Sequence, residues 1–381
     1  MRVRRLVAIV AAALVAACCL VGVSFALPAS DAADPSLEYG YVYSGVKSED
    51  IPFTLAASHD DSYFLFGSSE LATYPHIVST APDNVLMDYD CGYQFMYIGE
   101  AYDQDLWMAI AAGAYADDMP NKKVGIIVSA QWFFDGGLEP GIFKMRFSYP
   151  LYDAFCRNSR ISDDTKAYVA QRLHDEGVDQ TLIDAASGSL PQDAINNVVF
   201  DAMGDLSLRQ RVQEEHEWAK PLSTATEPPD YDALRVEGAQ EGQSSCTNND
   251  YAVLDEYWDE YIAPKYDELA GTMANETLTD TTEYADLQCF LDVCRETGLE
   301  PYVIIMPVNG KWYDYLGLSA DVRAVWADRV VGMCNDAGVE CLDLTSHEYE
   351  PYYLRDVMHF GWLGWVDVEE AFASFVKGGR S

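Results

Sequence analysis

The stretch Tyr63-Phe64-Leu65-Phe66-Gly67-Ser68-Ser69-Glu70-Leu71 decides the fold that we expect for this chain. Its four apolar residues predict a short buried strand, Gly67 predicts a tight turn, and the residues from Glu70 onward can start a helix. In open α/β folds such a turn into a helix N-terminus is where ligands bind, because the N–H groups there favour negative charge. A serine in the turn is a candidate nucleophile. Serine is also common in turns and helix caps, so this stretch alone favours a cap.

Strands and helices alternate on both sides of this stretch. Further strands are predicted at residues 94–98, 123–128, 302–306 and 339–344, and helices at residues 101–115, 284–297, 320–337 and in the segment that ends at about Val376. Such alternation implies right-handed βαβ units and a parallel sheet. The sequence therefore predicts an α/β protein.

Residues 149–275 interrupt the alternation, because they contain helical patterns and no convincing strand. We expect helices at residues 162–176, 193–206, 208–219 and 251–269, and a Pro/Ser/Gly/Gln-rich loop at residues 223–249. We interpret this block as a helical insertion that covers one edge of the sheet and either shapes substrate access or is structural only. The expected domain that contains it spans residues 61–378, after a tether at residues 30–60.

The N-terminus carries a membrane-targeting pattern. Arg2, Arg4 and Arg5 precede residues 6–29, a run of 24 residues without a charge, and about 20 apolar residues span the hydrocarbon core of a bilayer. With the arginines in the cytoplasm, the rest of the chain lies outside. We favour an uncleaved anchor; a signal peptide that ends near Ala26 and a lipoprotein signal with a lipidated Cys18 are the alternatives.

The overall charge and the cysteines limit the classes of partner. With 24 basic and 62 acidic side chains, the formal net charge is -38, which argues against nucleic acid and against docking on an anionic lipid surface. Seven cysteines follow the uncharged run, and two local pairs, Cys289/Cys294 and Cys334/Cys341, can form disulfides outside a cell. The chain has no C-x-x-C motif and no zinc-like Cys/His spacing, so we expect no metal and no cofactor.

Among the six histidines, His359 stands out because Asp356 lies three residues before it. On a helical turn positions i and i+3 share a face, so the carboxylate can accept the Nδ1 hydrogen and leave Nε2 free as a base. A lone D-x-x-H is frequent by chance. Combined with the serine turn, however, it completes the order Ser…Asp…His, one of several that build a catalytic triad.

An acyl-transfer site also needs hydrogen-bond donors aimed at an oxyanion. The candidates are the backbone N–H groups of Ser69 and Gly99 and the side-chain amide of Gln131. All three follow the carboxyl ends of successive predicted strands. We therefore expect them along one rim of the sheet.

Two motifs, Phe66-Gly67-Ser68-Ser69 and Asp356-x-x-His359, resemble the SGNH (GDSL-type) hydrolase superfamily, with Ser68 in place of its usual Asp. More narrowly, the chain resembles the DltD family of D-alanyl-lipoteichoic acid biosynthesis proteins. The segments that carry this resemblance are Gly67-Ser68-Ser69-Glu70, Ser129-Ala130-Gln131-Trp132-Phe133, Pro307-Val308-Asn309-Gly310-Lys311-Trp312-Tyr313 and the stretch from Asp356 to Trp365. The resemblance spans nearly the whole chain. Ala130 departs from the usual proline of the family, and the linker at residues 223–246 and the high acidity are unusual.

The resemblance implies an SGNH-like three-layer α/β/α fold with a mostly parallel five-stranded sheet. It also implies a single-pass membrane protein, with its N-terminus in the cytoplasm and its catalytic domain outside, that helps to load D-alanine onto teichoic acid in Gram-positive bacteria. The implied partners are the teichoic acid polymer, a D-alanyl donor and membrane D-alanyl transfer proteins, with the D-alanyl carrier protein as a candidate.

Site residues follow from the same resemblance, position by position. It implies Ser69 rather than Ser68 as the nucleophile, His359 as the general base and Asp356 as the residue that orients the base. The second and third oxyanion donors would be Gly99 and Gln131. We expect the motif residues Asn309, Trp312 and Tyr313 either to line the acceptor side or to form a packed aromatic loop.

Two other functions stay open at this point. An extracytoplasmic SGNH esterase or thioesterase acting on envelope esters would use the same triad, but generic esterases lack the segments at residues 129–133 and 307–313. A non-enzymatic scaffold of a membrane D-alanylation complex would need the N-terminal anchor and would not need Ser69.

Overall fold

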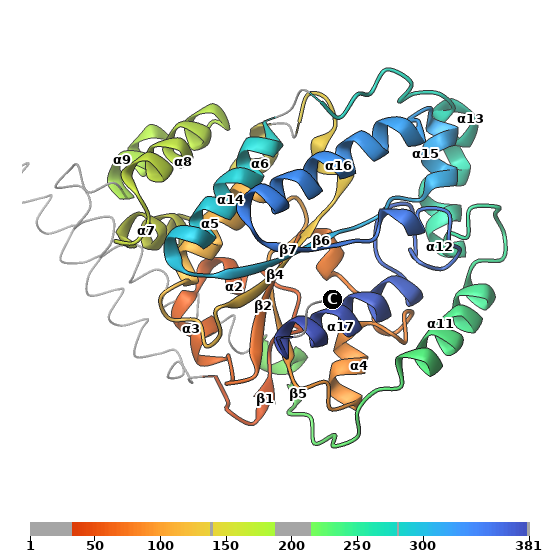
Figure 1. Ribbon diagram of the computed structural model, residues 1–381, viewed down its shortest axis with the longest axis horizontal. Coiled ribbons are helices and arrows are strands. Elements are labelled where there is room, and N and C mark those ends of the chain that lie inside the picture. The colour runs from red at the N-terminus through yellow and green to blue at the C-terminus, as the bar shows by residue number, and fades with distance from the viewer. Residues whose placement is uncertain (1–32, 138–139, 187–214, 280–281, 379–381) are drawn as a thin grey trace, which may run out of the picture.

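A five-stranded parallel sheet forms the centre of the molecule (Figure 1), for which a computed structural model describes residues 33–137, 140–186, 215–279 and 282–378. The strand order is β3-β2-β4-β6-β7, and every neighbouring pair is parallel. The strands are β2 (Ser62–Phe66), β3 (Gln94–Ile98), β4 (Lys123–Val128), β6 (Glu300–Ile305) and β7 (Glu340–Asp343). This arrangement confirms the predicted α/β fold, and β3 and β4 begin and end at the predicted residues.

Two helical layers cover the two faces of the sheet. On one face lie α5 (Asp105–Tyr115), α14 (Glu283–Thr297) and α16 (Ala320–Ala337); on the other lie α4 (Pro82–Asp88), α11 (Tyr231–Ser245) and α17 (Trp362–Val376). Successive side chains of a strand point to opposite faces. Accordingly, Phe64 and Phe66 are buried in the core on the α5 side, whereas Leu65 is buried in the core on the α17 side.

The segment expected to be a tether packs onto the sheet. It contains β1 (Leu37–Glu38), which pairs with β5 (Lys220–Pro221), and the short helices α2 (Val46–Glu49) and α3 (Ile51–Ala56). Tyr39 and Phe53 are buried in the core. The backbone N–H of Tyr97, in the edge strand β3, donates to Gly40 O at 2.9 Å. The N-terminal segment therefore covers the β3 edge of the sheet.

The described helices of the insertion cover other helices rather than an edge of the sheet. From residue 149 to residue 186 these are α7 (Tyr149–Arg157), α8 (Asp163–Asp175) and α9 (Gln180–Ala186), of which α7 packs on α5 and α8 packs on α14. The later helix α11 packs on α17, and α6 (Pro140–Arg146) lies just before the expected insertion. The helix predicted at residues 193–206, and all but the end of that predicted at residues 208–219, lie outside the described residues.

The prediction of a loop at residues 223–249 is wrong, because residues 231–245 form the helix α11. Asp230 caps this helix by accepting a hydrogen bond from Ala233 N at 3.1 Å. The glycines that suggested a loop are needed for close packing: a Cβ atom on Gly242 would come within 2.6 Å of Tyr352 Cβ. Composition alone does not distinguish a flexible glycine from one that lets a helix approach its neighbour.

The single helix expected at residues 251–269 is also wrong. The chain there forms four short segments: α12 (Asp255–Tyr257), the π-helical η3 (Trp258–Ile262), the 3-10 segment η4 (Ala263–Lys265) and α13 (Tyr266–Leu269). Pro264 has no backbone N–H and cannot continue an α-helix from within. The break therefore falls at the proline.

The N-terminal anchor expected at residues 6–29 lies outside the described residues. Within the described ranges, no helix is both long enough and apolar enough to cross a membrane. All seven cysteines of these ranges are free thiols in the structure.

Three buried carboxyl groups lie where α5 meets α14. The backbone N–H of Asp105 donates to Glu283 Oε1 at 2.9 Å, and Asp286 forms an ion pair with Arg172 at 2.8 Å. Burial, together with the negative charge of Asp286, raises the pKa of Asp105 well above its usual value. Burial beside Asp105 raises the pKa of Glu283 as well, so the folded protein keeps a proton on the Asp105–Glu283 pair that the unfolded chain releases above about pH 4, and the contribution of the pair to stability falls as the pH rises from that value.

We expect Asp105→Asn to raise the free energy of unfolding by about 1–2 kcal/mol at pH 8, and by less at pH 5, because the amide needs no proton to be buried. Denaturant unfolding at the two pH values measures the change. Asp286→Asn is the matched control and should lower the free energy of unfolding, since Asp286 is the partner of Arg172. Equal destabilisation by Asp105→Asn at both pH values would contradict a protonated Asp105.

Candidate active site

The turn after β2 presents one of its two serines to solvent. Gly67 N donates to Ile98 O at 3.1 Å, which fixes the end of β2 against β3. The helix expected from Glu70 is only the 3-10 turn η1 (Ser69–Leu71). Ser68 is buried, with 1% of its surface exposed, whereas Ser69 is half-buried. Of the two serines, Ser69 is therefore the one a substrate can reach.

Asp356 and His359 lie on the loop between η5 (Thr345–His347) and α17. The expected helical turn is absent from this loop; instead Asp356 Oδ1 accepts hydrogen bonds from the backbone N–H groups of Met358 and His359, both at 2.9 Å. The second oxygen, Oδ2, lies 2.8 Å from His359 Nδ1. The aspartate therefore orders both the backbone of the loop and the imidazole ring.

The structure brings Ser69 and His359 together although 290 positions separate them. Ser69 Oγ lies 2.9 Å from His359 Nε2. Since the Asp356 carboxylate can only accept, the imidazole hydrogen belongs on Nδ1, and Nε2 is then free to accept the hydroxyl hydrogen of Ser69. A hydroxyl, an imidazole and a carboxylate in this order can activate the hydroxyl as a nucleophile.

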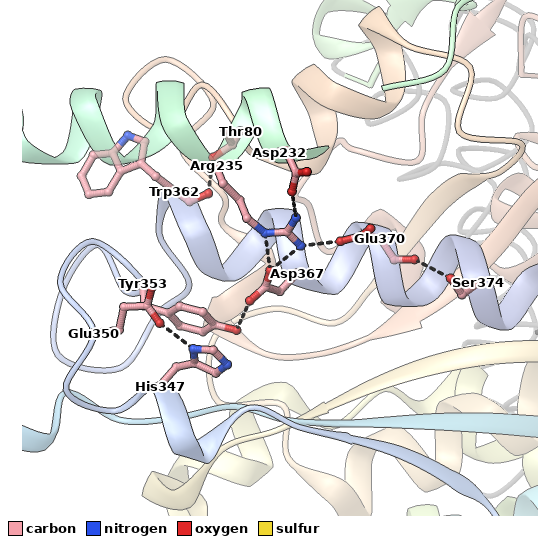
Figure 2. A network of polar contacts seen from close by, with 10 residues as sticks. All are labelled: Thr80, Asp232, Arg235, His347, Glu350, Tyr353, Trp362, Asp367, Glu370 and Ser374. Atoms are coloured by element: carbon pink, nitrogen blue, oxygen red, sulfur yellow. Dashed lines mark hydrogen bonds and ion pairs between the residues drawn. The ribbon is translucent and has the colours of Figure 1, made fainter. Parts of the chain in front are cut away.

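Helices α11 and α17 hold the loop in place (Figure 2). Arg235, on α11, donates to Asp367 Oδ1 on α17 at 2.8 and 2.9 Å and also contacts Glu370. Asp367 Oδ2 accepts the Tyr353 hydroxyl hydrogen at 2.9 Å, and Tyr353 O accepts Gly361 N–H at 2.8 Å. The chain on both sides of Asp356 and His359 is thus tied to the helical layer.

Arg355 joins the two halves of the site. Its Nη1 lies 3.3 Å from Asp356 Oδ2, and its Nη2 donates to Ala72 O, three residues after Ser69, at 3.2 Å. Burial by itself would raise the pKa of the Asp356 carboxyl, but the positive charges of His359 and Arg355 outweigh burial and hold it well below its usual range. Asp356 is therefore ionised at any pH at which the protein would work.

Gly99 and Gln131, the other two expected oxyanion donors, both lie beside the serine turn. Gln131, in η2 (Ala130–Phe133), donates from Nε2 to Glu70 Oε1 at 3.4 Å. Glu70 Oε2 accepts Ser68 N–H at 3.0 Å, and burial raises the pKa of Glu70. A contact of Gly99 or Gln131 with an oxyanion stays a prediction.

The Gly99 turn packs directly on the serine turn. Gly99 has a φ of +124°, and a Cβ atom there would come within 2.0 Å of Gly67 O. We therefore expect Gly99→Ala to lower the free energy of unfolding by at least about 3 kcal/mol, because both the backbone conformation and the space exclude a side chain. Gly298→Ala is the control: its φ is +76° with no atom within 4 Å of a Cβ, so only backbone strain of about 1 kcal/mol is expected. Equal losses for the two variants, measured by denaturant unfolding, would contradict the steric argument.

Asn309, Trp312 and Tyr313 belong to a packed loop and to the first turns of α15 (Gly310–Leu316). The Asn309 side chain accepts Trp312 N–H at 3.1 Å and donates to Tyr251 O at 2.8 Å, while Asn309 N donates to Val357 O at 3.0 Å. Trp312 and Tyr313 are buried. These contacts support the Asp356 loop from behind; a contact with substrate stays a prediction.

Sequence reasoning missed two charged residues beside the site, Glu70 and Arg355. Each lies next to a residue of the predicted triad, and each is more than nine-tenths buried. The only sequence signal for either residue was its charge beside a residue of the triad. No group of described residues has the composition and geometry of a metal site.

Comparison with known proteins identifies one family. A family model described as DltD protein matches residues 45–377. Protein DltD of Bacillus subtilis (strain 168) is 26% identical over 335 residues, which cover 84% of each chain. Protein DltD of Staphylococcus aureus (strain NCTC 8325 / PS 47) is 26% identical over 83% of this chain and 81% of the relative. Protein DltD of Lacticaseibacillus rhamnosus is 25% identical over 82% of this chain and 76% of the relative.

Proposed function

The chain belongs to the DltD family, and we propose that it is an extracytoplasmic, membrane-anchored acyltransferase in the D-alanylation of lipoteichoic or wall teichoic acid. The observation that carries the acyl-transfer chemistry is the hydrogen-bonded series of Ser69 Oγ, His359 Nε2 and Nδ1, and Asp356 Oδ2, with distances of 2.9 and 2.8 Å. Family membership supports the D-alanyl group and the polymer as substrates. The uncharged run at residues 6–29 supports the anchor, with the catalytic domain outside the cell.

In the first proposed step, the Ser69 hydroxyl attacks the carbonyl carbon of a D-alanyl ester or thioester while His359 Nε2 takes the hydroxyl proton. The backbone N–H groups of Ser69 and Gly99 and the Gln131 amide would stabilise the negative charge that develops on the carbonyl oxygen. The proton passes from His359 to the leaving alcohol or thiol, and a D-alanyl ester of Ser69 remains. Asp356 stabilises the imidazolium that forms between these events.

In the second step, a hydroxyl group of the glycerol- or ribitol-phosphate polymer replaces water as the nucleophile. His359 takes the proton of that hydroxyl, the bond between D-alanine and Ser69 breaks, and Ser69 regains its proton. The products are a D-alanyl ester of the polymer and the free enzyme. The donor would reach the protein through membrane D-alanyl transfer proteins and a D-alanyl carrier protein.

Trapping the acyl-enzyme tests this function. Full-length protein mixed with a D-alanyl thioester and quenched in acid should gain the mass of one D-alanyl group, on the peptide that contains Ser69. Adding a poly(glycerol phosphate) acceptor should remove the adduct faster than water does and should yield D-alanylated polymer.

The two alternative functions predict different results in the same experiment. An envelope esterase forms the adduct but releases free D-alanine at a rate that the polymer does not change. A scaffold forms no adduct. Either result would overturn the acyltransferase.

A further inference from the structure

Exposed aromatic side chains surround a cavity next to the serine turn. Tyr43, Tyr74 and Trp218 line this cavity of about 770 Å³ and are 36%, 44% and 75% exposed. Tyr102, which is 54% exposed, lies beside them, because Tyr43 Oη accepts the N–H of Ala101 at 2.6 Å. We call these four residues the aromatic rim. They come from segments that are far apart in the sequence, so local composition does not explain the cluster.

Such a cluster has a restricted set of uses. Single exposed aromatic residues are common, but a group of them around a cavity marks an interaction surface. Tyrosine and tryptophan combine an apolar ring with a polar hydroxyl or N–H group, and both are enriched where a protein meets the boundary between lipid and water.

The start of the described chain lies next to the rim. Asp34 N donates to Tyr39 Oη at 3.0 Å, and Tyr39 Oη lies 2.6 Å from His216 Nδ1, two residues before Trp218. The uncharged run ends at Ala29, four residues before Ala33. Four extended residues span at most about 14 Å. The described chain therefore begins close to the rim, four residues after the uncharged run.

We propose that the aromatic rim rests on the surface of a bilayer of zwitterionic lipids, into which residues 6–29 insert; the inference rests on the anchor of the proposed function. Carboxyl groups outnumber basic groups in the cavity wall, where Lys220 and His76 stand against Glu38, Glu49, Asp83, Glu100 and Glu215, although Glu100 is paired with Arg146. The chain as a whole has a net charge of -38, so anionic headgroups are repelled. Leu71 to Tyr74 form one wall of the cavity directly after Ser69. Contact with the bilayer thus holds the serine turn near the surface, within reach of an acceptor that is anchored in lipid.

Trp218 supplies a reporter at the rim, because the other seven tryptophans are buried or half-buried. Full-length protein is reconstituted in phosphatidylcholine vesicles with bromine atoms near the headgroup end of the acyl chains. Tryptophan emission should fall relative to unbrominated vesicles, and the fall should disappear in Trp218→Phe. Replacing a third of the lipid by phosphatidylglycerol at low salt should reduce the quenching, and salt should restore it.

A tryptophan introduced at another position of the Trp218→Phe variant gives the matched comparison. Tyr74→Trp places a tryptophan on the rim, so the emission of that variant should be quenched. Tyr349→Trp is the control: Tyr349 is 46% exposed but does not line the cavity, so the emission of that variant should not be quenched. If both wild type and Trp218→Phe float with the vesicles and are quenched equally, the aromatic rim does not contact the bilayer and the proposal is wrong. If the wild-type protein does not float with the vesicles, both the membrane anchor and the contact of the rim with the bilayer are contradicted. Ser69→Ala should be quenched like wild type, so a failure of the acyl-transfer chemistry is seen separately.

Discussion

Replacing Ser69 by alanine is expected to abolish acyl transfer, with a rate loss of at least about 10,000-fold. In the proposed mechanism the hydroxyl forms the covalent intermediate, and His359 and Asp356 only activate it. The side chain is half-buried and hydrogen-bonds to His359 Nε2. Its removal leaves no buried cavity, so the free energy of unfolding should stay within about 0.5 kcal/mol of wild type.

The neighbouring serine is the control for this variant. Ser68 is buried, and its backbone N–H, which alanine keeps, donates to Glu70. Ser68→Ala should therefore keep acyl transfer within about tenfold of wild type. Polymer D-alanylation by the purified full-length protein and the D-alanine ester content of cells measure both variants. Wild-type ester content in Ser69→Ala cells would favour the scaffold. An equal loss of acyl transfer in Ser68→Ala would contradict the assignment of the nucleophile to Ser69 rather than Ser68.

The sheet was predictable from sequence because its strands are short apolar runs bounded by clear breaks. Lys123 to Val128 ends at a serine turn, and the structure begins and ends β4 at those residues. The helix α11 was missed because Gly238 and Gly242 resemble loop residues in the sequence, whereas they serve close packing against Trp362 and Tyr352. That distinction depends on residues more than 100 positions away, which a local pattern does not contain.

The candidate site likewise contains residues that the sequence predicts and residues that it does not. Ser69, Asp356 and His359 were predictable because each is a chemically distinctive residue at a strand end or in a short motif. Arg355 was not, because its importance comes from contacts with Asp356 and with Ala72 O, which lies 283 positions away. Glu70 gains its place through Gln131, on a different strand end. Spatial relations between motifs decide such roles, and they appear only in the folded chain.

Replacing Asp356 by asparagine is expected to reduce acyl transfer by about 1,000- to 10,000-fold while largely preserving the fold. The asparagine Oδ1 can still accept the N–H groups of Met358 and His359, which keeps the loop ordered. The amide nitrogen, however, replaces Oδ2 and faces His359 Nδ1 as a second donor. The imidazole must then carry its hydrogen on Nε2, where it can no longer accept the proton of Ser69.

Measurement across pH separates this tautomer effect from a simple loss of structure. Because the Asp356 pKa is held well below its usual range, the carboxylate stays ionised between about pH 6 and 8, so titration of Asp356 itself adds nothing to the pH dependence of the wild-type rate in this range. The sign for stability is the reverse of that for Asp105: the ionised Asp356 stabilises the fold above about pH 4, and this contribution is lost as the pH falls below that value. Acid unfolding of wild type should therefore be steeper than that of Asp356→Asn. An Asp356→Asn protein that transfers D-alanine at the wild-type rate would exclude Asp356 as the residue that orients His359.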